Sequence, residues 1–146
     1  GLYDVAVHFS KCCSPVPGDE IVGFVTRGRG VSIHRTDCIN IINLSDMERE
    51  RLIDAEWQHD EESGSSGLYL AEIKVFCNNR TGLLVDITRA FTERAIDINA
   101  IHSKTSKQGI ATIDISFNTK GKAELTSVID KLRQIDSIID IERTTG

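Results

Sequence analysis

The order in which apolar residues repeat along residues 68–146 is the feature that most restricts how this chain folds. Alternating apolar residues are typical of a strand, and apolar residues three or four positions apart are typical of a helix face. These patterns predict strands over 71–77, 96–100, 111–117 and 139–141, and helices over 83–95 and 125–132. The order strand-helix-strand-strand-helix-strand is the split βαβ or ferredoxin-like arrangement, in which both helices cover one face of an antiparallel sheet.

Turn chemistry separates these segments. The polar residues 78–82 end the first strand, and Thr81 is predicted to cap the helix that follows. Residues 106–109 have the composition of a hairpin turn. The strand within residues 96–101 is a candidate for an exposed edge of the sheet.

Residues 59–67 divide the chain. They are acidic, then rich in glycine and serine, and offer no apolar residue for burial, which is typical of a flexible linker. The chain is therefore expected to contain a module over residues 1–58 and a second over residues 68–146. The expected fold class is α+β, with a small β-rich module preceding the ferredoxin-like βαββαβ domain.

The first module is less regular than the second. Its predicted elements are strands over 5–9, 21–25 and 30–33, turns at 15–18 and 28–30, a short helix capped by Thr36 or Asp37, and an amphipathic stretch within 47–57 that ends in a strand. Roughly 55 residues bury too little surface to depend on a hydrophobic core alone. A metal ion would be an unsurprising additional source of stability.

Cysteines and histidines supply candidate ligands in this module. Cys12 and Cys13 are adjacent, and His34 and Cys38 are close enough in sequence to share one side of a turn. Three thiolates and one imidazole would satisfy a tetrahedral zinc ion. Neighbouring side chains tend to diverge, so His8 is an alternative to one of the two adjacent cysteines.

Two other interpretations of these residues stay open. The cysteines are buried thiols in the first, with His34 on the surface of a turn. In the second, His34 activates Cys13 or Cys38 as a nucleophile, although no oxyanion loop or third orienting residue is evident. A fourth cysteine, Cys77, is interpreted as a core residue of its strand.

Basic residues flank the cysteine cluster. Lys11, Arg27, Arg29 and Arg35 would form a positive patch if their loops converge, and such a patch suits RNA phosphates. The alternative is a set of solvated loops. The net charge of −5 argues against generic binding to polyanions.

The turn before the first helix of the second module is another candidate site. Gly82 permits a ligand to approach the backbone N–H groups of a helix N-terminus, which favour a carboxylate. With Asn79, Arg80, Leu83 and Leu84 beside it, a small anionic ligand such as an amino acid is a plausible occupant. An ordinary tight turn between strand and helix is the alternative.

Composition sets the remaining expectations. Forty per cent hydrophobic and 27% charged residues are typical of a soluble folded protein. No apolar run approaches the roughly 20 residues that span a bilayer, so we expect no membrane partner and a cytoplasmic location. The chain opens on Gly1 without an initiator methionine, and we interpret it as a fragment whose parent carries any enzyme activity elsewhere.

A family resemblance rests on a long and unusual run of residues. The sequence KCCSPVPGDEIVGF at 11–24, TRGRGV at 26–31 and HRTDC at 34–38 resembles the conserved-cysteine or zinc-finger module of long bacterial RelA/SpoT-type (p)ppGpp synthetases/hydrolases. Residues 68–146 are similar to the ACT domain that ends these proteins. The resemblance implies a structural zinc ion at Cys12, Cys13, His34 and Cys38, with His8 as an alternate ligand and no catalytic cofactor.

The same resemblance implies a regulatory role. In that family, hydrolase and synthetase domains precede these modules, and the modules contact ribosomal RNA and tRNA during starvation. It also implies control of the parent's catalytic domains, homodimerisation through the ACT domain and, in some members, binding of branched-chain amino acids.

Overall fold

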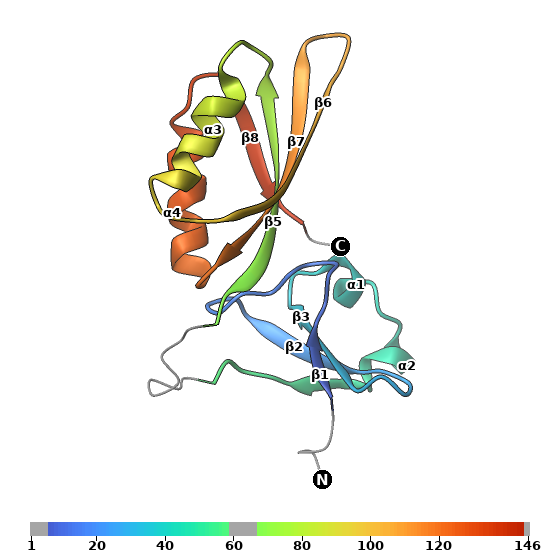
Figure 1. The fold of residues 1–146 in the computed structure, drawn as a ribbon. Coiled ribbons are helices and arrows are strands. Elements are labelled where there is room, and N and C mark those ends of the chain that lie inside the picture. Colours follow the sequence, from blue (N-terminus) through green and yellow to red (C-terminus); the bar gives the residue numbers. More distant parts are fainter. Residues whose placement is uncertain (1–5, 59–66, 145–146) are drawn as a thin grey trace.

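The structure is a computed structural model that describes residues 6–58 and 67–144. These residues form two units packed end to end (Figure 1). We call residues 6–58 the N-terminal module and residues 67–144 the C-terminal module. The predicted linker lies outside the described residues except for Gly67. No helix in the described ranges combines the length and apolar character needed to cross a bilayer.

In its described part, the N-terminal module is built on a sheet with the strand order β1-β3-β2-β4. Its elements are β1 (Val7–Phe9), β2 (Ile21–Val25), β3 (Val31–Arg35), α1 (Ile39–Ile42), α2 (Asp46–Arg49) and β4 (Leu52–Asp54). β1 runs parallel to β3, whereas β2 is antiparallel to both of its neighbours. The predicted strand over 21–25 is confirmed, and the one predicted over 30–33 is present as β3, which begins at Val31 and continues to Arg35. The predicted first strand is present from Val7.

The helices of this module are short, and their start differs from the prediction. The N-cap of α1 is Cys38 and receives no side-chain cap, so the proposed capping by Thr36 or Asp37 is wrong. α2 is instead held by a capping box, in which Ser45 and Glu48 bond to each other's backbone N–H groups. A small core of Cys13, Cys38 and Ile41 lies beneath these helices.

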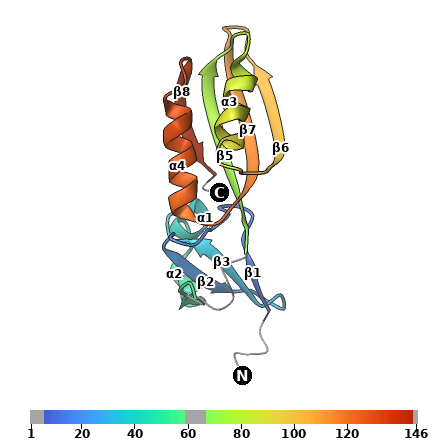
Figure 2. The same ribbon diagram turned by 60° about the vertical axis from the view of Figure 1, so that its left-hand side comes forward.

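The C-terminal module has the predicted order of elements. They are β5 (Tyr69–Asn78), α3 (Leu83–Thr92), β6 (Ile98–Thr105), β7 (Ile110–Thr119), α4 (Lys122–Arg133) and β8 (Ile138–Arg143). The strand order is β6-β7-β5-β8, with every pair antiparallel. Figures 1 and 2 show α3 and α4 on the same face of this sheet, which is the ferredoxin-like arrangement. Alternate residues of β5 and β7 are buried beneath the helices.

Two details of this module depart from the sequence patterns. The N-cap of α3 is Gly82, with φ of 81° and no side-chain cap, so Thr81 does not cap the helix. Ile139 and Ile141 do not share a buried face, because the register shifts by one residue where β8 pairs with the end of β5. Ile139 is therefore 55% exposed, whereas Ile141 is buried.

The predicted hairpin and edge strand are confirmed. Ser106 and Gly109 close the turn between β6 and β7 through backbone hydrogen bonds, and Gly109 has φ of 82°. β6 forms one edge of the sheet in the described part of the chain, and nearly all of its residues are exposed. Its backbone is thus available for pairing with another strand.

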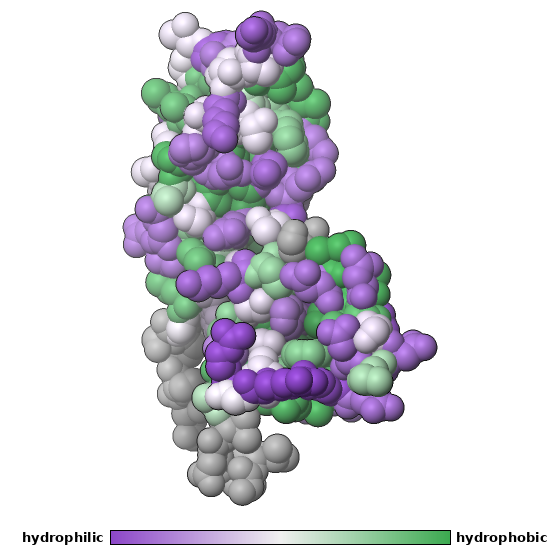
Figure 3. All heavy atoms as spheres, turned by 90° about the vertical axis from the view of Figure 1, so that its right-hand side faces the viewer, coloured by the Kyte–Doolittle hydropathy of each residue, from purple (hydrophilic) through white to green (hydrophobic). Residues whose placement is uncertain are grey.

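The two modules share a packed seam. Val16 of the N-terminal module is fully buried within the core of the C-terminal module. Asp19 forms an ion pair with Arg143 of β8, and the carbonyl of Pro17 accepts a hydrogen bond of 2.7 Å from the N–H of Lys122. The face shown in Figure 3 is mainly hydrophilic, with hydrophobic patches on both modules. The seam therefore joins elements that lie on either side of residues 59–66 in the sequence.

Candidate metal centre and ligand pocket

The sheet of the N-terminal module brings the predicted metal ligands together. Cys12 and Cys13 lie in the loop after β1, His34 lies in β3, and Cys38 precedes α1. Because β1 is parallel to β3, its outgoing loop runs beside the end of β3, and Ser10 N–H donates to the carbonyl of Ile33. The ligand atoms of Cys12, Cys13, His34 and Cys38 all lie within 4.8 Å of one another.

The spacing of these atoms fits a tetrahedral ion. The Cys12 sulfur is 3.4 Å from His34 Nδ1 and 3.4 Å from the Cys38 sulfur, and the Cys13 sulfur is 3.9 Å from His34 Nδ1. In a zinc site with Zn–S bonds of about 2.3 Å and Zn–N bonds of about 2.0 Å, ligand atoms are roughly 3.5–3.8 Å apart. The cluster is therefore able to hold a metal ion with little rearrangement.

Ser32 contacts the ring of His34 so that Nδ1 faces the cluster. The hydroxyl of Ser32 lies 3.0 Å from Nε2, on the far side of the ring from the sulfurs. When Nε2 carries the proton and donates to this hydroxyl, Nδ1 is left with its lone pair toward the cluster. Burial, together with the charge of nearby His8, lowers the pKa of His34 and favours the neutral ring that a metal requires.

The cysteine side chains differ in how readily they ionise. Burial raises the pKa of Cys13 to about 12, and burial also raises the pKa of Cys38. Burial opposes ionisation of Cys12 as well, but hydrogen bonds from Ser10 and Asn40 outweigh it and lower its pKa. A cation among these sulfurs would favour all three thiolates.

The same burial disfavours the interpretation of these residues as a nucleophilic pair. Cys13 is 1% exposed and Cys38 is fully buried, so neither sulfur offers an approach to a substrate. Reactive cysteines are usually accessible and have a lowered pKa, which is the reverse of what Cys13 shows.

His8 lies near His34 but is not part of the cluster. It is an exposed residue of β1 that is aligned with Ser32, and it is not among the ligand group that the described residues form. The geometry therefore favours the adjacent pair Cys12 and Cys13 over the alternative ligand set that includes His8.

The predicted basic patch does not assemble. Arg35 is 6% exposed, and its guanidinium donates to the carbonyls of Cys13 and Thr144 and to the carboxylate of Asp37. The interpretation of Arg35 as an RNA-contacting residue is corrected: it holds the loop and the seam. A side chain that is buried with its donors engaged is unavailable to a phosphate.

Lys11, Arg27 and Arg29 are exposed, but they do not lie together. Arg27 and Arg29 occupy the turn between β2 and β3, whereas the loop that carries Lys11 lies at the other end of β3. The five residues of β3 span about 16 Å at about 3.3 Å per residue. The exposed charges form two separate sites.

The residues predicted around the turn before α3 do line one pocket. Its volume is about 180 Å³, and it is lined by Asn79, Arg80, Gly82, Leu83, Leu84, Val85, Ser103 and Ile113. Ser103 comes from the edge strand β6, so the pocket lies between α3 and that edge. The sequence patterns around the turn do not indicate this contribution.

Arg80 is less available to bind a ligand carboxylate than its position in the sequence indicates. Its guanidinium bonds to the carboxylate of Asp86 at 2.7 Å and to the hydroxyl of Ser137 at 2.7 Å. Further hydrogen bonds reach the carbonyls of Thr81 and Asp136. A carboxylate ligand would therefore compete with Asp86 for this charge.

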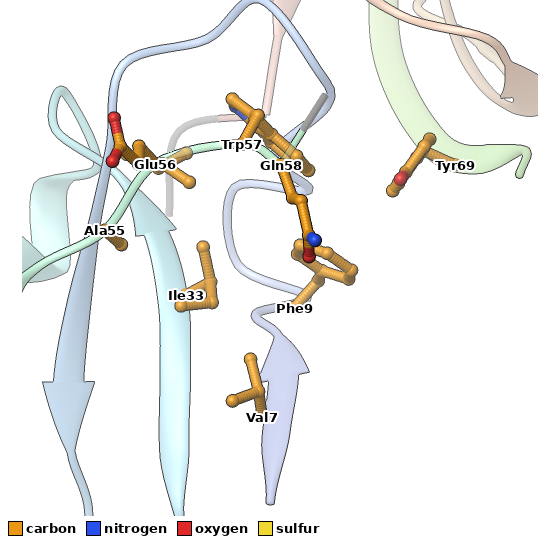
Figure 4. A pocket seen from close by; sticks show the side chains of 9 residues that line it. Val7, Phe9, Ile33, Ala55, Glu56, Trp57, Gln58 and Tyr69 are labelled. Carbon is orange, nitrogen blue, oxygen red and sulfur yellow. The ribbon is translucent and has the colours of Figure 1, made fainter. Parts of the chain in front are cut away.

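A larger pocket of about 370 Å³ opens at the seam (Figure 4). Phe9 stacks on Trp57 with ring centres 5.4 Å apart, and Tyr69 meets both rings edge-on. The indole N–H of Trp57 donates to the carbonyl of Asp19. Trp57 thus anchors the packing here, and its partners come from distant segments that no local pattern connects.

Each module matches the model of a known domain family. Residues 65–143 match the model of the ACT domain, and residues 1–58 match the model of the RelA/SpoT RIS domain. The chain belongs to the ACT-domain family. Its N-terminal module, which contains the cysteine cluster, is similar to the RIS domain throughout the matched residues.

Curated proteins that are similar to this chain match it over both modules. The chain is 40% identical over 147 residues to the GTP pyrophosphokinase of Escherichia coli, and 38% identical over 146 residues to that of Streptomyces coelicolor. These matches cover all of this chain but only 19% and 17% of the two relatives. A crystal structure of the ACT domain from the GTP pyrophosphokinase of Chlorobium tepidum is 27% identical, with a TM-score of 0.47 over 53% of this chain and 99% of that one.

Proposed function

We propose that this chain is the regulatory, non-catalytic C-terminal region of a stringent-response (p)ppGpp synthetase/hydrolase. The observation that carries the proposal is the end-to-end match to GTP pyrophosphokinases, with an RIS domain followed directly by an ACT domain. The chain corresponds to less than a fifth of those relatives, so the catalytic domains of the parent would lie elsewhere. The region would contact ribosomal RNA and tRNA and pass that signal to the catalytic domains.

A structural zinc ion is part of this proposal. Cys12, Cys13, His34 and Cys38 would hold it, because three sulfurs and an imidazole nitrogen, the donor set of a structural zinc site, lie within 4.8 Å of one another. When bound, zinc supplies cross-linking of β3, α1 and the loop after β1, which a module with so small a core needs. The hydroxyl of Ser32 orients His34, and the backbone N–H of Arg35 bonds to the Cys13 sulfur.

The exposed cations of the N-terminal module are the proposed contacts to RNA. Lys11, Arg27 and Arg29 lie in loops at the two ends of β3, where each is exposed and could meet a phosphate. The test is sedimentation of the full-length parent with ribosomes that carry uncharged tRNA in the A site. Changing all three residues to Glu should weaken co-sedimentation at least tenfold.

A control separates a specific contact from a change in charge. Lys104, Lys107 and Lys120 are exposed residues of the C-terminal module, so a triple Glu variant there alters the net charge equally. The control variant should keep most of its ribosome binding. Equal losses in the two variants, or no loss in either, would rule out this RNA-contacting surface.

A second candidate function is that of an amino-acid sensor that acts through dimerisation. It is favoured by the pocket of about 180 Å³ that all five predicted ligand residues line, beside the free edge of β6. Apolar Leu83 and Leu84 suit a branched aliphatic side chain, and the start of α3 suits its carboxylate. A second copy that pairs at β6 would enclose the pocket further.

Calorimetry with valine, leucine and isoleucine tests this candidate. Heat of binding should be present in the wild type and in Ser103→Ala, and lost in Ser103→Leu, which fills the pocket from β6. Sedimentation velocity with and without ligand measures the accompanying dimerisation. Silence with all three amino acids at millimolar concentration would eliminate the sensor function.

A further inference from the structure

One loop serves both the cysteine cluster and the seam. The segment between β1 and β2 carries Cys12 and Cys13 in its first half, where their sulfurs face His34 and Cys38. Its second half carries Val16, Pro17 and Asp19, which contact the C-terminal module. Only Ser14 and Pro15 lie between the two sets of contacts, and both are buried.

The contacts of the second half are specific and tight. Val16 is fully buried in the core of the C-terminal module. The carbonyl of Pro17 accepts from the N–H of Lys122, and a Cβ on Gly121 would lie 3.0 Å from that carbonyl oxygen. Asp19 accepts hydrogen bonds of 2.8 and 2.9 Å from Arg143. A shift of the loop would therefore break several contacts at once.

Two arginines tie the halves of the loop together. Arg35 follows the ligand His34, and its guanidinium bridges the carbonyl of Cys13 to the carbonyl of Thr144, at 3.2 and 3.0 Å. Arg143 reaches from β8 to the carbonyl of Ser14 as well as to Asp19. Ser14 has φ of 47°, a left-handed conformation that a non-glycine residue adopts only where its surroundings hold it.

We propose that metal binding at the cysteine cluster controls whether the two modules are locked together. The metal holds Cys12 and Cys13 in position and so sets the conformation of the loop that they begin. That conformation places Val16 and Asp19 in contact with the C-terminal module. In the metal-free chain the loop relaxes and the modules separate. This inference rests on the zinc site of the proposed function and adds a regulatory output to it.

Thermodynamic linkage makes the proposal testable in both directions. If the metal favours the docked arrangement, docking must favour the metal by the same factor. A substitution that weakens the seam without touching a ligand should therefore weaken zinc binding from a distance.

The chain contains its own reporter for the seam. Trp57 is the single tryptophan, and it bonds to Asp19 and packs against Tyr69 of β5. Figure 4 shows its ring beside the seam pocket, near Phe9. Separation of the modules would expose the indole, so its emission would shift to longer wavelength.

The first experiment removes zinc from the 146-residue chain with a chelator. Zinc content, Trp57 emission and the radius of gyration from solution scattering are followed, and zinc is then restored. We expect one zinc per chain, a red shift and a larger radius on removal, and recovery of both on restoration. Zinc binding with no change in emission or radius overturns the coupling alone; absence of zinc binding overturns the zinc site and the coupling with it.

The second experiment distinguishes coupling from simple unfolding of the N-terminal module. Asp19→Asn weakens the seam and leaves the four ligands intact, whereas Asp114→Asn makes the same chemical change in an ion pair with Lys74 away from the seam. Zinc affinity, measured by competition with a chromogenic chelator, should fall at least tenfold in Asp19→Asn and stay within twofold in Asp114→Asn. Equal affinity in the two variants would refute the proposal.

Discussion

The carboxylate of Asp19 accepts hydrogen bonds of 2.8 and 2.9 Å from the guanidinium of Arg143, although 124 residues separate them in sequence. The same carboxylate accepts from the N–H of Val16, so it holds its own loop and the partner module together. Its side chain is only 4% exposed. Burial by itself would raise the pKa of Asp19, but the hydrogen bonds from Arg143 and Val16 outweigh burial and lower it.

The lowered pKa of Asp19 predicts how stability depends on pH. Because the folded state holds the carboxylate charged, its contribution is fully present above the unfolded pKa of about 3.9 and is lost as pH falls through the lower folded pKa. Asp19→Asn should lower the free energy of unfolding by about 3 kcal/mol at neutral pH, because it leaves Arg143 poorly paired. The cost should be smaller at pH 3, because the contribution of the charged carboxylate begins to fall below the unfolded pKa of about 3.9. Urea unfolding at both pH values measures the difference, and an equal loss at both would contradict the linkage.

Truncating Val16, which belongs to the N-terminal module in sequence, should destabilise the C-terminal module. Val16→Ala leaves a cavity at the edge of the loop in the core that β5, β7 and the helices also share, and should cost about 2 kcal/mol. Val7→Ala is the matched control, because Val7 is 61% exposed and should change stability by less than about 0.5 kcal/mol. Hydrogen exchange of amides in β5 and β7 should quicken in the first variant only. Unchanged exchange would show that Val16 does not belong to that core.

The architecture of the C-terminal module was predictable because its periods are long and regular. Ten residues of β5 alternate between buried and less buried positions, and the apolar stripe of α3 faces the sheet, so local spacing reports tertiary position. The exceptions are local. Gly82 starts α3 because its positive φ suits the tight turn, and the bulge in β8 displaces Ile139, which no alternation reveals.

The cysteine cluster was predictable as a set of residues, whereas its surroundings were not. Spacing and residue type indicate Cys12, Cys13, His34 and Cys38, but the roles of Ser32 and Arg35 depend on where β3 and Thr144 lie in space. Arg35 had the sequence context of an exposed cation. Its position beside Thr144 results from packing between modules, which periodicity within one segment does not encode.

Two glycines in the turn between β2 and β3 should differ in how well they tolerate substitution by alanine. Gly28 and Gly30 both have positive φ, but a Cβ on Gly28 meets open space, whereas a Cβ on Gly30 would collide with the carbonyl of Ala6. Gly28→Ala should cost about 1 kcal/mol from backbone strain alone. Gly30→Ala should lower the stability further, because it also breaks the hydrogen bond from the N–H of Val31 to the carbonyl of Ala6. That bond aligns the start of β1 with β3. Thermal unfolding of both variants measures the difference; equal melting temperatures would argue against the close approach at Gly30.

Replacing Ser32 should weaken metal binding by more than its effect on the stability of the fold explains. Ser32→Ala removes the partner of His34 Nε2, so the imidazole loses its orientation toward the sulfurs. Loss of such a partner typically weakens metal binding by about 10- to 100-fold, with the stoichiometry retained. Ser45→Ala is the control in the same module: it removes the capping box of α2 and should cost about 1 kcal/mol, but it should leave zinc affinity unchanged. Competition with a chromogenic chelator and thermal unfolding, measured on both variants, separate the two effects. If zinc affinity instead follows stability in both, Ser32 acts through the fold and not through His34.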